Sequence, residues 1–185
     1  MPRDIITDFR DGIFALNTRR FGNVAELMIQ EMFGLEDSGT TKYDKFDPRY
    51  GNRIEVKFSK ASKKHDTTIT RVNLVDSCLH APDFASEIIA SNEVDSIPFD
   101  SNIQQVKPDQ FDVLFYGQFF LDIITIYSVS SASIEVLPNY SNKQHRGNTG
   151  EGQFHLNNRT IHLHRDYLQR EITYRDLFEM FYYRR

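Results

Sequence analysis

The chain has 185 residues, a length that suits one domain with a substantial hydrophobic core. Its hydrophobic content of 39% is ordinary for a globular protein, and no apolar stretch approaches the length of a membrane span. Cys78 is the only cysteine, which excludes a disulfide framework and a thiolate zinc site. The first residues contain no signal-peptide hydrophobic run. We therefore expect a soluble, cytoplasmic, single-domain protein that makes no contact with a membrane.

The net charge of −4 is unusual for a protein that binds DNA by itself, but the charges are unevenly distributed. Residues 42–71 contain nine Lys or Arg and four acidic residues, whereas residues 83–122 contain eight acidic residues and one lysine. A basic block suits contacts with phosphates. An acidic block suits solvent or a partner protein, and solvated surface is the alternative interpretation of each single charge.

Residues 10–33 are predicted to form a helix that ends at Gly34. Apolar side chains recur at helical spacing at Phe21, Val24, Ala25, Met28 and Met32. Glu26 lies inside this apolar helix, where a bare carboxylate would be costly to bury. A metal ion or a buried basic partner would explain it, and a solvated position on the rim of the helix is the alternative. Glu31, nearer the helix end, is the substitute candidate.

Residues 43–59 predict a strand, a tight polar turn and a second strand. The turn chemistry comes from Asp47, Pro48, Gly51 and Asn52. Residues 53–58 alternate strictly, and side chains two apart on a strand share a face. One face of this strand therefore carries the apolar side chains of Ile54, Val56 and Phe58.

The opposite face of the same strand presents Glu55 and Lys57, beside Arg53. Asp44 can reach the same cleft if the two strands pair across the turn. Two carboxylates and a lysine at one place suit phosphodiester hydrolysis, because carboxylate oxygens hold a hard divalent cation and the cation activates a water. The lysine can orient that water and offset developing negative charge. The alternative is an ordinary amphipathic hairpin with a solvated polar face, since Glu-x-Lys is common on strands.

An Asp, a turn and then Ile-Glu-Val-Lys resemble the active-site hairpin of the PD-(D/E)xK nuclease superfamily, which includes most restriction endonucleases. On this resemblance Asp44, Glu55 and Lys57 are the catalytic residues and Mg²⁺ is the cofactor. The metal ligands would be Asp44, Glu55 and the backbone carbonyl of Val56, and Glu26 would assist directly or through a water. Glu26 is similar to a glutamate that faces the metals from the preceding helix in this superfamily.

The first acidic position has two candidates. The Pro-Asp pair of the superfamily is absent, because Pro48 follows Asp47 instead of preceding an Asp. Asp47 is therefore an alternative to Asp44. We prefer Asp44, since Asp47 occupies the place of a turn-opening Asp.

Residues 60–65 form a basic loop directly after the Glu-Val-Lys strand. In nucleases of this type the corresponding loop faces the DNA backbone, so the resemblance implies phosphate contacts. With Arg53 from the basic block, the predicted DNA-binding residues are Lys60, Lys63, Lys64 and Arg53. Contacts of this kind read no bases.

In the second half of the chain, residues 68–79 could be strand or short helix, residues 83–91 predict a short amphipathic helix, and residues 91–108 predict a loop. The near-continuous apolar runs 111–116 and 121–129 predict central strands covered on both faces, on either side of a tight turn at Gly117–Gln118.

Residues 138–152 form a polar segment whose Lys143, His145 and Arg146 could touch nucleic acid or a partner. Residues 153–164 predict a hairpin that turns at Asn157–Asn158. In it, His162 and His164 would share one strand face at the spacing of an imidazole metal pair, with a solvated edge as the alternative. Residues 173–183 predict an amphipathic helix with Thr173 as its N-cap.

Together these patterns predict an α/β fold, a restriction-endonuclease-like core with a mixed β-sheet flanked by α-helices, spanning 1–185. The predicted function is a Mg²⁺-dependent DNA endonuclease. In size and in residues 21–57 the chain is similar to the small cleavage subunits of heterodimeric type IIS restriction endonucleases, in which a larger subunit recognises the sequence and nicks the other strand. The implied partners are double-stranded DNA and such a subunit. The alternatives are an autonomous homodimeric or repair-type nuclease and a non-catalytic DNA-binding or assembly subunit.

Overall fold

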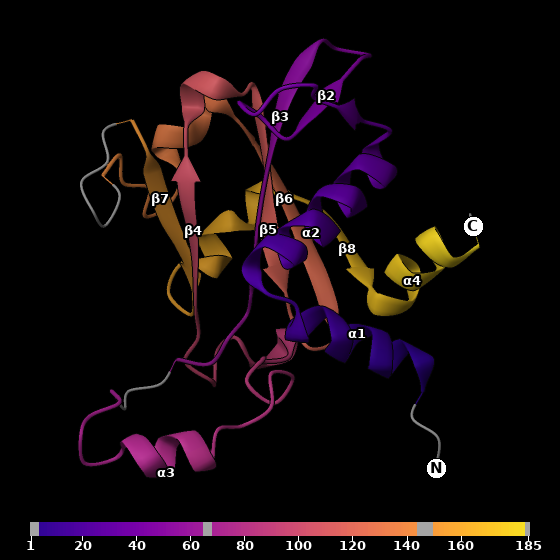
Figure 1. The fold of residues 1–185 in the computed structure, drawn as a ribbon. Helices are drawn as coiled ribbons and strands as arrows, with labels where there is room; N and C mark the ends of the chain where they lie inside the picture. Colours follow the sequence, from indigo (N-terminus) through magenta and orange to yellow (C-terminus); the bar gives the residue numbers. More distant parts are fainter. Residues whose placement is uncertain (1–3, 65–67, 144–149, 184–185) are drawn as a thin grey trace.

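The computed structural model describes residues 4–64, 68–143 and 150–183. Its centre is a six-stranded sheet of order β1-β2-β3-β5-β6-β8, in which β3 and β5 run parallel and the other neighbours antiparallel (Figure 1). The expected mixed α/β fold is confirmed. The strands of this sheet are β1 (Glu36–Asp37), β2 (Lys45–Asp47), β3 (Asn52–Lys60), β5 (Val113–Phe119), β6 (Ile123–Ser130) and β8 (Leu168–Thr173).

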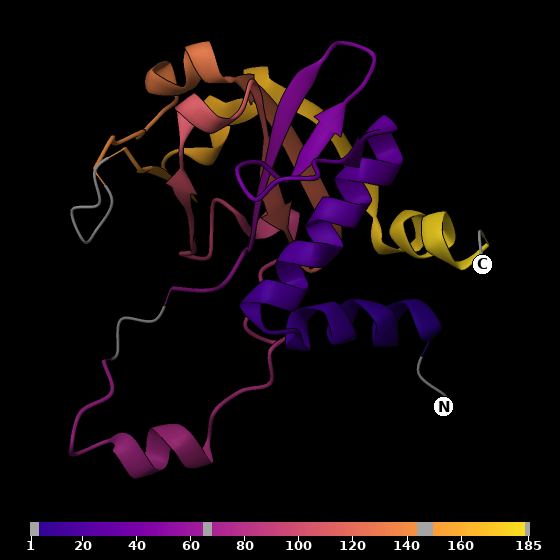
Figure 2. The same cartoon turned by 45° about the horizontal axis from the view of Figure 1, so that its top comes forward.

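Three helices cover one face of the sheet, and Figures 1 and 2 show them together on that side. They are α1 (Ile5–Ala15), α2 (Thr18–Phe33) and α4 (Tyr174–Tyr182). The predicted single helix over 10–33 is wrong, because the chain is extended at Leu16 and Asn17. The Asn17 side chain accepts a hydrogen bond from the Arg20 backbone N–H at 3.1 Å, which starts a new helix. Gly34, at φ 63°, ends α2 as predicted.

A second, two-stranded sheet covers the opposite face of the main sheet. It pairs β4 (Asp100–Val106) with β7 (Gly152–Asn157), and its apolar side chains pack with those of β5 and β6. The sequence prediction missed β4 by assigning 91–108 to a loop. The predicted hairpin over 153–164 is also wrong, because β7 pairs with the distant β4 and Ile161–Tyr167 form a 3₁₀-helix.

The strands β5 and β6 are central, as predicted: all but one residue of β5 and most residues of β6 are buried. The predicted turn at Gly117–Gln118 is wrong, since both residues lie inside β5. A Cβ atom at Gly117 would lie 1.9 Å from the Thr125 carbonyl oxygen and 2.5 Å from a ring carbon of Phe58. This glycine therefore permits a close approach between strands and does not mark a turn.

The remaining connections contain one exposed helix. Residues 68–79 include α3 (Leu74–Leu79), which has no buried residue. The predicted helix over 83–91 is wrong, because this segment forms turns and an isolated bridge between Ser62 and Ile88.

The last helix, α4, follows the sequence prediction. The Thr173 hydroxyl accepts from the Asp176 N–H at 3.1 Å, and the Asp176 carboxylate accepts in return from the Thr173 N–H at 2.8 Å. His145 and Arg146 lie outside the described residues. Within the described part of the chain, no helix combines the length and the apolar character needed to cross a bilayer.

Candidate active site

The candidate site lies where the outer edge of β3 becomes free of β2. The short strand β2 pairs with β3 only as far as the Lys45–Ile54 pair. Beyond it, the Asp44 carboxylate accepts a hydrogen bond from the Val56 backbone N–H at 2.8 Å. Since N–H and C=O of one strand residue point to the same side, the Val56 carbonyl is directed to the side of the strand that Asp44 occupies.

The face of Glu55 and Lys57 follows from the register with β5. Glu55 is paired with Leu114 and Lys57 with Tyr116, and these partners pack under the second sheet. Ile54 and Val56 lie in the core beneath the helices. The alternation predicted for this strand is therefore present in the structure.

The three residues predicted to be catalytic lie together. The Lys57 ammonium contacts the Glu55 carboxylate directly and lies 3.8 Å from Asp44 Oδ2. Glu55 is only 8% exposed, so this ion pair is largely removed from water. Such a compact group of opposite charges on a buried strand differs from the solvated polar face of an ordinary amphipathic hairpin.

Burial sets the pKa values in this cluster. Burial raises the pKa of Glu55, and the negative charge of Asp44 adds to the rise while Lys57 opposes it. Burial alone would lower the pKa of Lys57, but Glu55, Asp44 and Glu26 outweigh it and raise that pKa. Lys57 is therefore a firmly protonated ammonium, whereas Glu55 holds its negative charge less readily than a solvated glutamate does.

Glu26, on α2, belongs to the same cluster. It is partly buried, and its pKa is raised first by that burial and then by the charge of Asp44. Lys45 and Lys57 both act in the opposite direction. Glu31 lies five residues further along α2, which places it about 140° around the helix from Glu26. The geometry thus favours Glu26 as the helix carboxylate of the site.

Sequence reasoning missed Lys45. Its side chain is buried and its ammonium lies 2.7 Å from the carboxylate of Asp37, on β1. It also lowers the pKa of the neighbouring Glu26. The available signal was the polar residue at an inward position of a short strand, but its partner Asp37 could not be identified without the β1–β2 pairing.

Asp47, the rival for the first acidic position, is occupied by the turn. Its two carboxylate oxygens accept from Arg49 Nε and Nη2 at 3.0 Å each, and Oδ1 also accepts from the Arg49 N–H. These hydrogen bonds from Arg49 lower the pKa of Asp47. The same guanidinium donates to the Phe33 carbonyl at the end of α2. Asp47 therefore fixes the turn against the helix, and Asp44 is the acid that faces Lys57.

Two of the four predicted DNA-binding side chains are bound within the chain. Arg53 forms a bidentate pair with Asp112, with Nε–Oδ2 at 3.0 Å and Nη2–Oδ1 at 2.8 Å. Lys60 Nζ donates to the Phe14 and Leu16 carbonyls at 2.6 and 3.0 Å, at the end of α1. These two cations hold strand and helix ends together, so we no longer count them as phosphate contacts.

The other two predicted DNA-binding residues lie just after β3. Lys63 Nζ donates to the Ser86 carbonyl at 2.6 Å while remaining near the surface. Lys64 is exposed and lines a pocket that is described below.

The predicted histidine pair does not share a strand face. His164 is fully buried among aromatic side chains, and its Nδ1 is 2.9 Å from the Tyr116 hydroxyl. His162 is near the surface and lies 2.8 Å from Asp95. Both residues belong to a 3₁₀-helix, in which residues two apart point in different directions. The imidazole metal pair is therefore excluded.

A magnesium ion fits the donor set of the cluster, although among the described residues no three His, Cys, Asp or Glu side chains form a ready metal site. Asp37, Asp44, Glu55 and Glu26 carry four negative charges against the two positive charges of Lys45 and Lys57, which leaves two negative charges in and beside a partly buried place. The donors are carboxylate oxygens and the Val56 carbonyl, which are the ligand types Mg²⁺ prefers. Asp44, Glu55 and Val56 would hold the ion, with Glu26 beside it.

Comparison with known proteins does not decide the function. No protein-family model matches the sequence, and no curated protein matches it significantly. The functional argument therefore depends on the geometry and charge of the site.

Proposed function

We propose that the chain is a Mg²⁺-dependent DNA endonuclease of the PD-(D/E)xK type, which hydrolyses phosphodiester bonds. One observation carries the proposal: Asp44, Glu55 and Lys57 converge at the free edge of β3 with a surplus of negative charge. A charge-neutral ion pair would suffice for structure alone. The additional carboxylates are explained by a cation that the site binds in use.

Each residue has a defined role in this proposal. Asp44, Glu55 and the Val56 carbonyl hold the magnesium, which supplies polarisation of the phosphate and an activated water. Lys57 keeps its proton and donates to the attacking water or to the phosphate oxygens, where it offsets developing negative charge. Glu26 accepts a hydrogen bond from a water at the edge of the cluster. Only 8% of Glu55 is exposed, so bulk solvent is largely excluded from it.

We further propose that the chain is the small, strand-cleaving subunit of a heterodimeric type IIS restriction endonuclease. Its net charge of −4, and the use of Arg53 and Lys60 inside the fold, leave few cations for phosphates. Large apolar side chains are also exposed between 68 and 86. Exposed apolar clusters indicate a protein partner, which here is the larger recognition subunit.

The test is a nicking assay on an end-labelled duplex with this chain, the larger subunit and both together, in Mg²⁺ and in EDTA. We expect little or no cleavage by this chain alone and cleavage of one strand, at a fixed distance from the recognition site, when both are present. Glu55→Ala should abolish that cut, whereas Glu135→Ala, the same change at an exposed position, should not. Site-specific double-strand cleavage by the chain alone would replace the subunit proposal with an autonomous nuclease.

In a third outcome, the wild-type chain binds DNA and assembles with the larger subunit while the strand that the larger subunit does not nick stays uncut. That result would identify the chain as the other alternative, a non-catalytic subunit.

A further inference from the structure

A pocket of about 580 Å³ lies beside the free edge of β3, further along the strand than the Asp44–Glu55–Lys57 cluster. Phe58 and Ser59 both line it, and because neighbouring strand residues point to opposite faces, the pocket spans the edge of the strand. Ser59 shares the strand face of Lys57 and lies two residues beyond it, a distance of about 7 Å. One DNA strand rises about 3.4 Å per nucleotide, so the pocket begins within about two nucleotides of the candidate cleavage site.

The walls of this pocket combine aromatic rings with uncharged polar groups. Phe58 is half-buried, and Phe84, which is 65% exposed, reaches the pocket from the end of the segment 68–86. Phe84 thereby differs from Leu79 and the other large exposed apolar side chains of that segment, which do not line the pocket. Hydroxyl and amide groups come from Asn17, Thr18, Ser59, Ser62 and Asn102.

The positive charge at the pocket is used within the chain. Among the described residues that line the pocket, Lys60 is the one cation, and its ammonium donates to the Phe14 and Leu16 carbonyls. The same ammonium lies 5.1 Å from the ring centroid of Phe21 and 5.9 Å from that of Phe84, within the range of a cation–π contact. Lys60 therefore supports the aromatic wall and has two of its three donors already bound, which leaves little for a phosphate.

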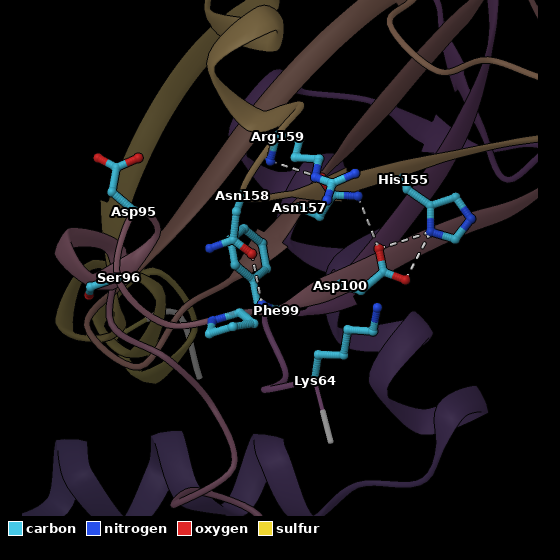
Figure 3. A pocket seen from close by; sticks show the side chains of 10 residues that line it. Lys64, Asp95, Ser96, Phe99, Asp100, His155, Asn157, Asn158 and Arg159 are labelled. Carbon is cyan, nitrogen blue, oxygen red and sulfur yellow. Dashed lines mark hydrogen bonds and ion pairs between the residues drawn. The ribbon is translucent and has the colours of Figure 1, made fainter. Parts of the chain in front are cut away.

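The negative charge at the pocket also opposes an anionic ligand. Asp100 is the one carboxylate among the described residues that line it, and its two oxygens lie 2.9 and 3.0 Å from His155 Nδ1 (Figure 3). Asp100 also lines a second pocket, of about 520 Å³, together with Lys64. A carboxylate at the rim repels a phosphate but can accept a hydrogen bond from a neutral donor such as the amino group of a base.

We propose that the pocket of about 580 Å³ holds one nucleobase, turned out of the duplex within about two nucleotides of the phosphate that is cut. This inference rests on the proposed endonuclease function and adds a binding site to it. A base is flat, uncharged and polar at its edge, so it stacks on Phe84 and Phe58 and forms hydrogen bonds with the hydroxyls of Ser59 and Ser62. The volume of the pocket lies within the range of about 300–1,000 Å³ that is typical of sites for small ligands.

The first test measures, by fluorescence polarisation at low salt and without divalent cations, how this chain alone binds two labelled 24-bp duplexes. One duplex is fully paired and the other has a single central mismatch, whose bases cost less to unpair, so the wild type should bind it about tenfold more tightly. Phe84→Ala removes the exposed stacking ring and should bind both duplexes equally. The matched control Leu79→Ala removes a similarly exposed side chain of the same segment and should keep the preference. Equal binding of both duplexes by the wild type would overturn the proposal.

A second arm locates the base and separates it from other occupants. With the larger subunit present, 2-aminopurine placed one or two nucleotides from the cut should become more fluorescent on binding, because it leaves the base stack, whereas 2-aminopurine six nucleotides away should not. No increase at the near positions would overturn the assignment. So would loss of the mismatch preference in 1 mM adenosine, which would indicate a site for a free nucleoside. Weaker assembly of Phe84→Ala with the larger subunit, with an unchanged mismatch preference, would assign the pocket to a protein side chain and also overturn the proposal.

The mismatch measurement does not depend on cleavage. If the preference depends on Phe84 while neither the wild type nor any variant cuts DNA, the pocket stands as a site for a base and the endonuclease proposal fails. If cleavage depends on Glu55 but the wild type shows no mismatch preference, the endonuclease proposal stands and the pocket assignment fails.

Discussion

Two regions of the molecule show opposite patterns of side-chain burial. One is the cluster of Glu26, Asp44, Glu55 and Lys57, and the other is the segment 68–86, here called the arm. In the cluster, charged side chains are buried or half-buried on β3 and beside it, where helices cover one face of the sheet and the two-stranded sheet covers the other. In the arm, large apolar side chains are exposed: Ile69 58%, Val72 94%, Leu79 74% and Phe84 65%. Figures 1 and 2 show α3 standing apart from both layers of the fold.

Folding by itself favours neither arrangement. Burying an unpaired carboxylate costs free energy. An apolar side chain left in water does not contribute the stabilisation of about 1.5–3 kcal/mol that full burial of a Val, Leu or Phe gives. A six-residue helix without packing is also too short to be stable in water. On the proposed function, a cation and a phosphate would complete the cluster, and a partner protein would cover the arm.

The largest expected effect concerns the carboxylates of the cluster. Asp44→Ala and Glu55→Ala should each lower the cleavage rate at least about 10³-fold, because each removes a ligand of the activating cation. Both variants should keep the wild-type far-UV circular dichroism spectrum. Asp47→Ala should instead retain cleavage and unfold more easily, by about 1–3 kcal/mol, since it frees Arg49 from the turn. Loss of activity in Asp47→Ala with retention in Asp44→Ala would reverse the assignment of the first acid.

Substitutions of Lys57 test whether its charge is catalytic or structural. Lys57→Ala should lower the single-turnover cleavage rate on the order of 10²- to 10³-fold, because the developing charge loses its donor. Magnesium affinity, measured by calorimetry, should stay the same or increase, since a positive charge has left the site. Lys57→Arg should not restore the rate, because a planar guanidinium does not replace a compact ammonium. A large loss of magnesium affinity in Lys57→Ala would instead make Lys57 a structural partner of the carboxylates.

The raised pKa of Glu55 and of Glu26 gives the cluster a pH dependence. A carboxyl group must lose its proton to bind the cation, and burial raises the pKa at which these two groups do so. Magnesium affinity should therefore begin to fall, as the pH decreases, at a higher pH than ordinary glutamates would dictate. Titration of magnesium affinity against pH, with Glu26→Gln as the comparison, measures this shift. A curve that falls only below the ordinary glutamate pKa would contradict it.

The buried side chain of His164 should make the free energy of unfolding depend on pH. Burial lowers its pKa to about 4, against about 6.5 in an unfolded chain. The unfolded chain therefore binds more protons between these values, so stability falls as the pH decreases from about 6.5 to about 4, by about 3 kcal/mol in total. Urea unfolding across this range should show the fall, and His164→Phe should flatten it whatever its own stability. An unchanged slope in that variant would assign the acid sensitivity to other groups.

The parts that could be predicted from sequence are those with local signals. The alternation of Ile54 to Phe58 predicts the strand and its faces, and the apolar runs predict β5 and β6 as central strands. The turn chemistry of Asp47 separates it from Asp44, which the structure places beside Lys57. In each case the determining residues lie within a few positions of one another.

The errors come from contacts that are distant in sequence. Strand β4 pairs with β7 about fifty residues away, and no local pattern encodes that partner. Arg53 pairs with Asp112, and Lys60 donates to the end of α1, and neither internal partner is indicated by the local sequence. The glycine at position 117 suggested a turn. It is present because the neighbouring strand passes too close to leave room for a Cβ atom, and only the β5–β6 register reveals this.

The smallest expected effect belongs to the arm. Leu79→Ser, on α3, should change the free energy of unfolding of the isolated chain by less than about 0.5 kcal/mol, because its side chain is mostly exposed before and after the change. The matched control Leu114→Ala, in the buried core of β5, should cost about 2–5 kcal/mol. Urea unfolding of both variants measures this contrast, and a loss above about 1.5 kcal/mol in Leu79→Ser would mean that the arm packs on the body in solution. If the arm docks on the larger subunit, Leu79→Ser should also raise the partner concentration needed for half-maximal cleavage while leaving the rate at saturating partner unchanged. A side chain that contributes nothing to folding and measurably to assembly is what distinguishes an interface from an exposed loop.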